Sequence, residues 1–328
     1  MKKILITGGT GFIGHHIIEH FLETTDNELV ILDRLDISGN LNRLTVIPCW
    51  EKEKDRVKFV WHDLKSEIND TISNTIGDID IILHLAAGSH VDRSIEDPMS
   101  FVMDNVVGTA NILNYARKAD IERMVYFSTD EVFGPAPEGV NYKEWDRYNS
   151  GNPYSASKAG AEELCLAFHN TYRLPVIVTH CMNVFGERQH PEKYIPMVIR
   201  SVLTGDKVTI HANSDLTKAG SRYYIHAKNV AKAVSFLLEN GKDGDKYNIV
   251  GEKEIDNLQL AQIIADYMGK ELNYELVDFH GSRPGHDLRY ALCGEKMEEM
   301  GWNLERNLEE SLQDVVDWSL DNKDWIDV

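Results

Sequence analysis

The chain has 328 residues, of which 42% are hydrophobic, and this is enough to bury a large core in one domain or in two that share an interface. A formal net charge of −19 repels nucleic acid and anionic membrane surfaces, so we expect neither as a partner. Glycines interrupt the first apolar run too early for an export signal or a membrane span, and the four cysteines form no CxxC pair, so we expect a protein of the reducing cytoplasm.

Short apolar runs alternate with longer amphipathic stretches through the first half of the chain. The predicted strands are KILIT, ELVILD, VKFVWH, DIIL, RMVYFS and PVIVTH, and the predicted helices span 12–24, 65–76, 98–119 and 153–172. This alternation predicts an α/β fold of the Rossmann type, a doubly wound parallel sheet that binds ligands at the carboxyl ends of its strands. The polar segment 34–55 is predicted to be a loop beside that ligand site.

The pattern loosens after about residue 180. Shorter strands are predicted near 207–210 and 245–249, and helices near 191–203, 227–239, 257–268 and 308–319. We infer a smaller C-terminal lobe that caps the sheet and binds the substrate. The expected boundary separates residues 1–180, joined by later segments at about 222–250, from residues 181–328, although no glycine- and serine-rich linker marks it.

Glycines follow the first predicted strand and open the first predicted helix. Gly9, Gly11 and Gly14 stand in GxGxxG register, and Gly8 can serve as the first glycine of a GxxGxxG pattern. Glycine there permits a tight turn and close approach of the backbone to a pyrophosphate, while the helix N-terminus supplies unpaired N–H groups. The turn therefore predicts a dinucleotide site.

An acidic residue ends the next predicted strand. Asp33 follows Gly14 by 19 residues, where a carboxylate can accept hydrogen bonds from the adenosine ribose. Its charge would repel a 2′-phosphate, so we expect NAD, although the neighbouring Arg34 leaves NADP open. The small residues of LHLAAGSH suit a close cofactor or simply tight packing. The predicted cofactor-binding residues are Gly8, Gly11, Phe12, Ile13, Gly14, Asp33, Asp63, Leu64, Leu85, Ala86, Ala87, Asn105, Ser128, Tyr154 and Lys158.

The first helix also carries HIIEH, from His16 to His20, which matches the H-x-x-E-H motif of a class of zinc proteases. The segment starts just after a phosphate-binding turn, on a helix that must pack against the sheet. No third ligand follows at a suitable distance. We therefore expect no metal site.

A tyrosine and a lysine lie four residues apart in NPYSASKAGAEEL, hence on one face of the predicted helix. An ammonium group beside a phenol lowers the pKa of the phenol by favouring phenolate. Lys158 could thus make Tyr154 a base that takes a hydroxyl proton while hydride leaves the same carbon for NAD. The alternative is an ordinary surface pair, but the glycine turn and a preceding strand that ends in Ser128-Thr129 favour catalysis.

Taken together, these motifs resemble a known family. The GGTGFIG turn, the YSASK helix and STDEVFG look like the extended short-chain dehydrogenase/reductase superfamily and, within it, the dTDP-glucose 4,6-dehydratase family. The resemblance covers nearly the whole chain, since LAAGSHVDRSIEDP, NVVGT, PEKYIP, YNIVG and RPGHDLRYA follow in that family's order. It implies an NAD-dependent enzyme that converts a nucleotide-diphosphate hexose to the 4-keto-6-deoxy sugar and water.

That reaction gives a reason for two acids at the end of a core strand. Oxidation at C4 acidifies the C5 proton, after which one carboxylate can take that proton while a carboxyl group donates to the departing C6 oxygen. The resemblance implies that Glu131 is the base at C5, Asp130 the acid at C6, and Thr129 a hydrogen-bond partner of the oxygen on C4. With Tyr154 and Lys158 they form the predicted catalytic set. The alternative for the acid pair is a solvated loop.

A nucleotide diphosphate needs cations, and these gather late in the chain, where the arginine fork suits phosphate oxygens. Any single one of them could instead be an ordinary surface charge. The resemblance implies that Asn183, Arg222, Asn257, Arg283 and Tyr290 bind the diphosphate and nucleotide, with Glu192 and Lys193 nearby. Ser89 and His286 complete the predicted substrate-binding set.

Three segments depart from the family pattern. Gly88 stands where LAAESH usually carries glutamate, and MNVFGERQHPEKY differs from the usual NNYGP run. HANSDLTKAGSRYYIHAKN keeps only the arginine of RDWLYVED. The nucleotide base and the hexose therefore stay open between the dTDP-glucose and UDP-glucose types.

Other functions are possible on the same scaffold. A 4-epimerase or a UDP-glucuronate decarboxylase needs the tyrosine, the lysine and NAD but no acid pair. A binding protein that senses NAD needs none of Asp130, Glu131, Tyr154 and Lys158, so the presence of all four argues against it. The superfamily also implies a homodimer formed by the helices at 98–119 and 153–172.

Overall fold

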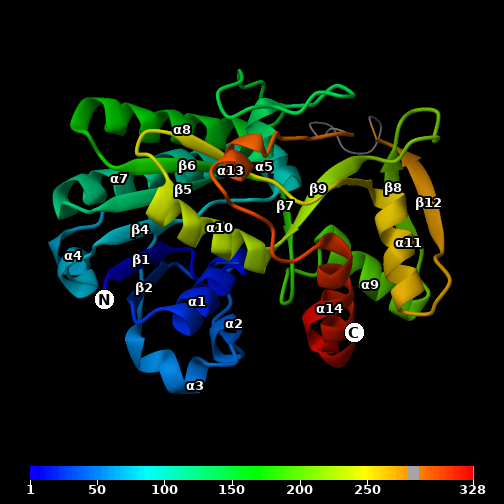
Figure 1. Ribbon diagram of the computed structural model, residues 1–328, viewed down its shortest axis with the longest axis horizontal. Helices are drawn as coiled ribbons and strands as arrows, with labels where there is room; N and C mark the ends of the chain where they lie inside the picture. Colours follow the sequence, from blue (N-terminus) through cyan, green and yellow to red (C-terminus); the bar gives the residue numbers. More distant parts are fainter. Residues whose placement is uncertain (280–287, 328) are drawn as a thin grey trace.

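The central layer of the protein is a seven-stranded sheet. In the computed structural model, which describes residues 1–279 and 288–327, the strand order is β10-β6-β5-β4-β1-β2-β3 and all neighbouring strands are parallel. The strands are β1 (Lys3–Thr7), β2 (Glu28–Asp33), β3 (Val57–Trp61), β4 (Ile81–His84), β5 (Arg123–Thr129), β6 (Val176–Cys181) and β10 (Lys246–Ile249). The order reverses beside β1, as in a doubly wound Rossmann fold, so the predicted fold class is confirmed (Figure 1).

Helices cover both faces of this sheet, and alternate strand residues pack against them. The covering helices are α1 (Phe12–Thr24), α4 (Asp70–Ile76), α7 (Gly108–Ala119), α8 (Pro153–Tyr172) and α10 (Ala227–Asn240). Ile4 and Ile6 of β1 share a core with α1 and α10, whereas Leu5 shares a core with α4, α7 and α8 (Figure 1). Burial on both sides explains the nearly continuous apolar strands. Among the helices of the described residues, none is long and apolar enough to cross a bilayer.

Capping side chains fix where α8 and α4 begin. Asn152 accepts a hydrogen bond from the Ser155 amide, and the Ser155 hydroxyl accepts one from the Asn152 amide, so α8 starts at Pro153 as predicted. The helix predicted from residue 65 begins only at Asp70, because the Asn69 side chain caps it there by accepting from Ile72 N.

A π-helical turn interrupts the helix predicted at 98–119. The chain forms α6 (Pro98–Phe101), then the π-helix η2 (Val102–Val107), and then α7. π-helical turns occur frequently at functional sites. This one carries Asp104 and Asn105, whose side chains are largely or fully buried.

The segment 34–55 contains short helices, so the prediction of an irregular loop was wrong. They are α2 (Asn42–Thr45), α3 (Trp50–Glu53) and the 3-10 turn η1 (Lys54–Arg56). Leu44 and Ile47 are buried in the same core as α1, which anchors the segment to the sheet domain. Other apolar residues of the segment, Ile37, Leu41 and Val46, are exposed, so its apolar residues do not mark one buried helical face.

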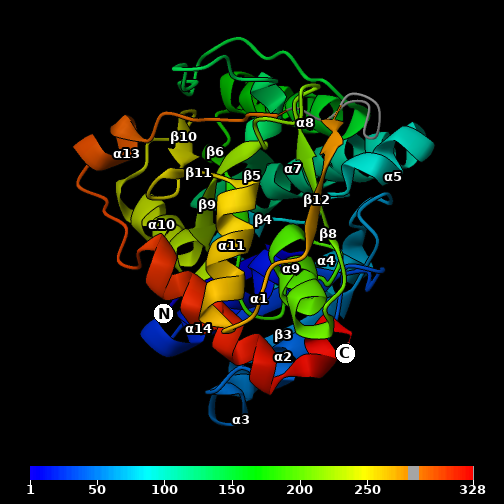
Figure 2. The ribbon, with the colours of Figure 1, turned by 90° about the vertical axis from the view of Figure 1, so that its right-hand side faces the viewer.

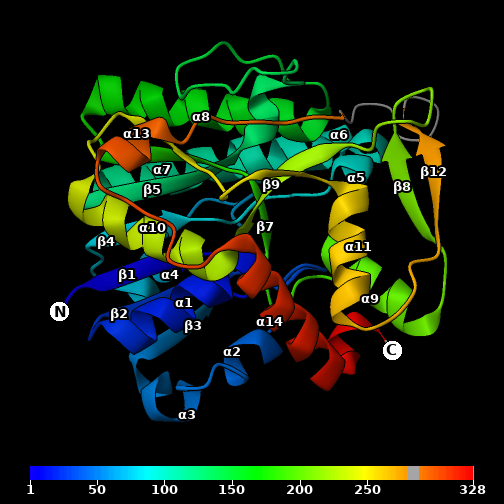
Figure 3. The same cartoon turned by 45° about the vertical axis from the view of Figure 1, so that its right-hand side comes forward.

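The C-terminal lobe has its own core and two small sheets. Its elements are β7 (Asn183–Phe185), α9 (Tyr194–Thr204), β8 (Val208–Ala212), β9 (Ser221–His226), β11 (Glu254–Asp256), α11 (Asn257–Tyr267), β12 (Tyr274–Asp278), α14 (Leu308–Asp321) and η4 (Lys323–Ile326). Helix α13 (Glu295–Glu299) instead packs against β10, and its Met297 lies in the core shared by α1 and α10. β11, β9 and β7 form one sheet, and β8 pairs with β12. Figure 2 faces the lobe, where α9, α11 and α14 pack together, and Figure 3 shows it beyond the strand ends.

The chain returns from the lobe to the main sheet. After β9, helix α10 packs against α1, and β10 then pairs with β6, with Lys246 opposite Val178. The lobe is therefore connected to the sheet by more than one crossing of the chain. A domain boundary at about residue 180 stays a prediction.

Buried polar side chains join α1 to the segment after β7. Arg188 donates to His15 Nε2 at 2.9 Å and to Glu19 Oε2 at 2.8 Å, and the side chains of Arg188 and Glu19 are each only 6% exposed. The second cation near Glu19 is Lys228, with its Nζ 3.8 Å from Oε1. The Arg188–Glu19 pair thus ties the first helix of the sheet domain to the start of the lobe.

The HIIEH segment is occupied by separate contacts. His16 Nε2 lies 3.1 Å from the Glu187 carbonyl oxygen, Glu19 pairs with Arg188, and His20 Nε2 lies 2.8 Å from Ser235 Oγ. Within residues 1–279 and 288–327, no group of three potential ligands has a geometry that could hold a metal ion.

We expect Arg188→Met to lower the free energy of unfolding by about 3–5 kcal/mol, because it leaves the buried Glu19 carboxylate with only the more distant Lys228. Denaturant titration followed by circular dichroism measures this. The double variant Arg188→Met/Glu19→Leu removes both charges and should recover most of the loss. A double variant as unstable as the single one would show that the ion pair is not the cause.

Candidate active site

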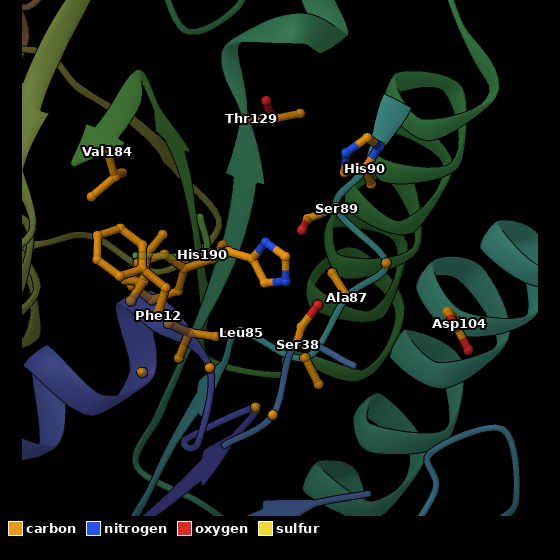
Figure 4. A pocket seen from close by; sticks show the side chains of 18 of the residues that line it. Phe12, Ser38, Leu85, Ala87, Ser89, His90, Asp104, Thr129, Val184 and His190 are labelled. Atoms are coloured by element: carbon orange, nitrogen blue, oxygen red, sulfur yellow. The ribbon is translucent and has the colours of Figure 1, made fainter. Parts of the chain in front are cut away.

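A cavity of about 500 Å³ lies at the carboxyl ends of the strands, between the sheet and the C-terminal lobe. Figure 4 shows residues around it from α1 (Phe12), from the segment after β4 (Leu85, Ala87, Ser89) and from the end of β5 (Thr129). The residues predicted from sequence that line it are Gly8, Gly11, Phe12, Ile13, Gly14, Asp33, Asp63, Leu64, Leu85, Ala86, Ala87, Ser89, Ser128, Thr129, Asp130, Glu131, Tyr154, Lys158, Asn183, Glu192 and Lys193. The predicted residues that do not line it are Asn105, Arg222, Asn257 and Tyr290. Arg283 and His286 lie outside the described residues.

The turn between β1 and α1 has the shape and polarity of a phosphate cradle. Gly8 has a φ of +69°, a conformation that L side chains rarely adopt. A Cβ atom on Gly14 would lie 2.4 Å from the Gly8 carbonyl oxygen, so only glycine lets the helix start this close to the turn. Gly11 offers no side-chain cap to the first N–H groups of α1, which leaves them for an anion.

Asp33 is held rigidly at the edge of the cavity. Its Oδ2 accepts hydrogen bonds from Thr10 Oγ1 at 2.6 Å and Thr10 N at 3.1 Å, and its Oδ1 accepts from Leu35 N at 2.9 Å. Each carboxylate oxygen can accept two hydrogen bonds. Oδ1 therefore keeps a position that fits a ribose hydroxyl.

Asn105 supports the cavity from behind. Its side-chain oxygen accepts from Gly88 N at 2.7 Å, and its amide nitrogen donates to Gly88 O at 3.1 Å and to Ser157 Oγ at 2.8 Å. It therefore joins the segment after β4 to the helix that carries Tyr154. A Cβ atom on Gly88 would lie 3.1 Å from the ring of Phe101, so Phe101 fills the space beside this glycine.

The end of β5 delivers the acid pair to the cavity. Thr129 caps the 3-10 turn η3 (Asp130–Phe133), accepting from Glu131 N at 3.3 Å and donating to Asp130 Oδ1 at 3.0 Å. Asp130 Oδ2 is buried and finds no hydrogen-bond partner in the described part of the chain. Glu131 Oε2 accepts from Asn152 Nδ2 at 3.1 Å.

Both acids are shifted toward the protonated form. Burial raises the pKa of Asp130. Burial, reinforced by the Asp130 charge, raises the pKa of Glu131 to about 7. Near neutral pH the pair can thus hold a proton on one carboxyl group while the other accepts one, which is the arrangement that a combined acid and base needs.

The prediction that Lys158 lowers the pKa of Tyr154 was wrong, because that pKa is raised. Burial and then the Glu131 charge raise the pKa of Tyr154, and a hydrogen bond with Thr129 opposes them. Lys158 Nζ donates to the Phe127 carbonyl oxygen at 2.5 Å, and burial lowers its own pKa to about 8. Desolvation by the cavity walls therefore outweighs the expected influence of the ammonium group.

Charged side chains line the lobe end of the cavity. Arg93 Nη2 donates to Glu192 Oε2 at 3.0 Å, and His90 Nε2 lies 3.6 Å from the same oxygen. Lys193 lies beside them in the lining. Arg93 and Lys193 thus supply two cations at this end of the cavity, and Glu192 lies between Arg93 and His90.

The three predicted substrate residues outside the lining lie one layer behind it. Arg222 donates through Nη1 to the carbonyl oxygens of Ser221 and Leu288, both at 2.6 Å, and lies 4.6 Å from the ring centre of Tyr290. Asn257 Oδ1 accepts from the hydroxyl of Tyr224, which itself lines the cavity, at 2.9 Å. Their roles as substrate ligands stay predictions.

The chain is similar to known proteins over nearly its whole length. The family model described as "NAD dependent epimerase/dehydratase family" matches residues 4–250. The chain belongs to this family. A dTDP-glucose 4,6-dehydratase from Escherichia coli is 36% identical over 99% of this chain and 94% of its own length.

Solved structures agree with this assignment. The dTDP-glucose 4,6-dehydratase DesIV from Streptomyces venezuelae, crystallised with NAD, matches 98% of each chain with a TM-score of 0.89 and 33% identity. A UDP-glucose 4-epimerase from Thermus thermophilus, in complex with NAD, matches 96% of this chain and 98% of its own with a TM-score of 0.85 and 27% identity.

Several residues that line the cavity of this epimerase/dehydratase family member were not predicted. They include Ser38, Gly39, Arg43, His90, Arg93, Asp104, Gln189 and His190. His90 and Arg93 lie within LAAGSHVDRS, so the motif itself was an available signal. Arg43 donates to the carbonyl oxygens of Thr10 and Ser38, and only the packing of α2 brings it there.

We expect Glu131→Gln to stabilise the protein at pH 8. The folded-state pKa of Glu131, about 7, lies above its ordinary value, so ionising it in the folded protein costs stability as pH rises toward 7. The glutamine variant avoids a cost of about 1–3 kcal/mol at pH 8 and little of it at pH 5. Thermal melts of both proteins across this range measure the difference. A constant difference would contradict the raised pKa.

Proposed function

We propose that the protein is a nucleotide-diphosphate hexose 4,6-dehydratase that forms the 4-keto-6-deoxy sugar and water through bound NAD. Relatives named as dTDP-glucose 4,6-dehydratases match nearly the whole chain, which supports the proposal. The observation that carries it is the convergence of Thr129, Asp130 and Glu131 with Tyr154 in the cavity that also contains the glycine turn. An epimerase site has no need of the two acids.

The cofactor end of the cavity fits NAD. The uncapped start of α1 and the glycine turn suit the pyrophosphate, Asp33 Oδ1 suits a ribose hydroxyl, and the segment after β4 with Lys158 suits the nicotinamide half. When bound, oxidised NAD supplies a hydride acceptor for C4 and, through its positively charged ring, favours the phenolate of Tyr154.

The first role of the protein is to take the proton of the C4 hydroxyl. Tyr154 accepts this proton as the C4 hydrogen leaves, and the Thr129 hydroxyl is a hydrogen-bond partner of the oxygen on C4. The resulting 4-keto group acidifies the hydrogen on C5. Burial of both side chains excludes water from this step.

The second role is the elimination of water. The Glu131 carboxylate takes the C5 proton, and the protonated Asp130 donates to the C6 oxygen, which leaves as water. A hydride returned to C6 and a proton returned from Glu131 to C5 complete the 4-keto-6-deoxy product. Burial raises the pKa of both acids, so the pair can share one proton near neutral pH, and the elimination uses the state in which that proton is on Asp130.

Substrate deuterated at C4 tests the internal transfer. We expect the label at C6 of the product within the same molecule, shown by NMR and mass spectrometry, with no NAD added to the purified protein. A mixture of labelled and unlabelled substrate should give no crossover. Label lost to solvent would exclude this function, and an epimer or a pentose as the product would favour the alternative activities. Parallel runs with dTDP-glucose and UDP-glucose would identify the nucleotide.

We expect Asp130→Asn and Glu131→Gln each to lower turnover by about 10²–10⁴-fold while oxidation at C4 persists, because each removes only the elimination step. Absorbance of reduced cofactor after one turnover would show the uncoupling. Glu138→Gln, at a side chain 88% exposed on the surface, is the matched control. Wild-type turnover in both amide variants would exclude the assigned roles.

Assembly and location complete the proposal. We infer a homodimer formed by the region of α6 to α8, supported by the exposed apolar side chains Met99, Val102 and Met103 on α6 and η2, and sedimentation measures it. We also infer a cytoplasmic location, supported by four cysteines that form no disulfide.

A further inference from the structure

Arg34 is held by two carboxylates at the rim of the cavity. It follows Asp33 at the end of β2, and its guanidinium donates to both oxygens of Asp104, at 2.5 and 2.8 Å. Nε and Nη2 also donate to one oxygen of Asp36, at 3.0 and 2.7 Å. Asp63 Oδ1 lies 3.5 Å from Nη1. Four of the five guanidinium N–H groups are thus bound by carboxylates.

Arg34 stands at the position that distinguishes NAD from NADP, so its contacts with Asp36 and Asp104 bear on cofactor choice. An acid at the end of the second strand accepts from the ribose 2′-hydroxyl of NAD, whereas an arginine nearby accommodates the 2′-phosphate of NADP. In this chain Asp33, the residue type that favours NAD, is followed directly by Arg34, the residue type that favours NADP. A phosphate could form a bidentate contact with the guanidinium only by displacing Asp36 or Asp104, and the bidentate geometry makes the Asp104 contact a strong one.

The surroundings are negative as well. Four carboxylates gather here, Asp33, Asp36, Asp63 and Asp104, against the three cations Arg34, Lys65 and Arg43, the last of which acts on Asp33. Four negative and three positive charges leave an excess of one negative charge. A 2′-phosphate adds almost two more at neutral pH. Because the Arg34 and Asp104 side chains are only 24% and 12% exposed, solvent screens this repulsion incompletely.

We propose that the Asp36–Arg34–Asp104 cluster determines cofactor choice, selecting NAD against NADP by occupying the arginine that would otherwise bind the 2′-phosphate. The inference rests on the proposed NAD-dependent function and adds the residues that set the choice. Asp33 alone does not explain it, since Arg34 stands next to Asp33 with the opposite preference. Asp104 reaches Arg34 from the π-helical turn η2, which is distant in sequence from β2.

A competition experiment tests the cluster. The purified wild type, Asp104→Asn and Asp36→Asn/Asp104→Asn are each incubated with equimolar NAD and NADP until the bound ratio is constant. The bound nucleotides are then released and quantified by chromatography. The amides keep the shape of the side chains and remove their charge. Asp243→Asn, which breaks an Arg–Asp pair outside the cavity, is the matched control.

We expect the bound NADP/NAD ratio to rise by about tenfold or more in the double variant, less in the single one, and not in the control. Adding Arg34→Ala to the double variant should abolish the gain. An unchanged ratio in both folded amide variants, or a gain that survives without Arg34, would overturn the inference while leaving the proposed function intact. A wild type that binds neither nucleotide would overturn both.

Discussion

Desolvation of two adjacent carboxyl groups at the end of β5 is the constraint on which the site depends. In water Asp130 and Glu131 would both be ionised at neutral pH and would serve neither as an acid nor as a shared proton reservoir. Burial raises both pKa values, and it also raises that of Tyr154. The cavity walls therefore help to set the protonation state of each reactive group, because the pKa of that group depends on how completely water is excluded from it.

Much of the fold could be predicted because its signals are local. The apolar runs of β1, β2 and β5 are buried on both faces, and the bounds of α1 and α8 agree with their glycine turn and capping residues. The short strands β7 and β11 were missed because three residues carry no period. The π-helical turn was missed because its sequence is as amphipathic as an ordinary helix.

The part of the site that lies at the strand ends could be predicted from the sequence. Parallel strands bring the residues that follow β1, β2, β4 and β5 to one edge, so the glycine turn, Asp33 and the acid pair meet as expected. Contacts made by packing between distant segments left no such signal. Arg43 reaches the glycine turn from α2, and Asn105 supports Gly88 from η2. The direction of the pKa shift of Tyr154 could not be predicted from the sequence either, because it depends on how deeply the side chain is buried.

The return of the chain to β10 has a consequence for how the molecule can be divided. β6 is buried along its whole length, and β10 covers the edge that it would otherwise present. A fragment that stops before β10 would leave that apolar edge open to pairing with other chains. The nucleotide-binding half is thus not a detachable module, and exchange of the lobe between relatives has to preserve the returning strand.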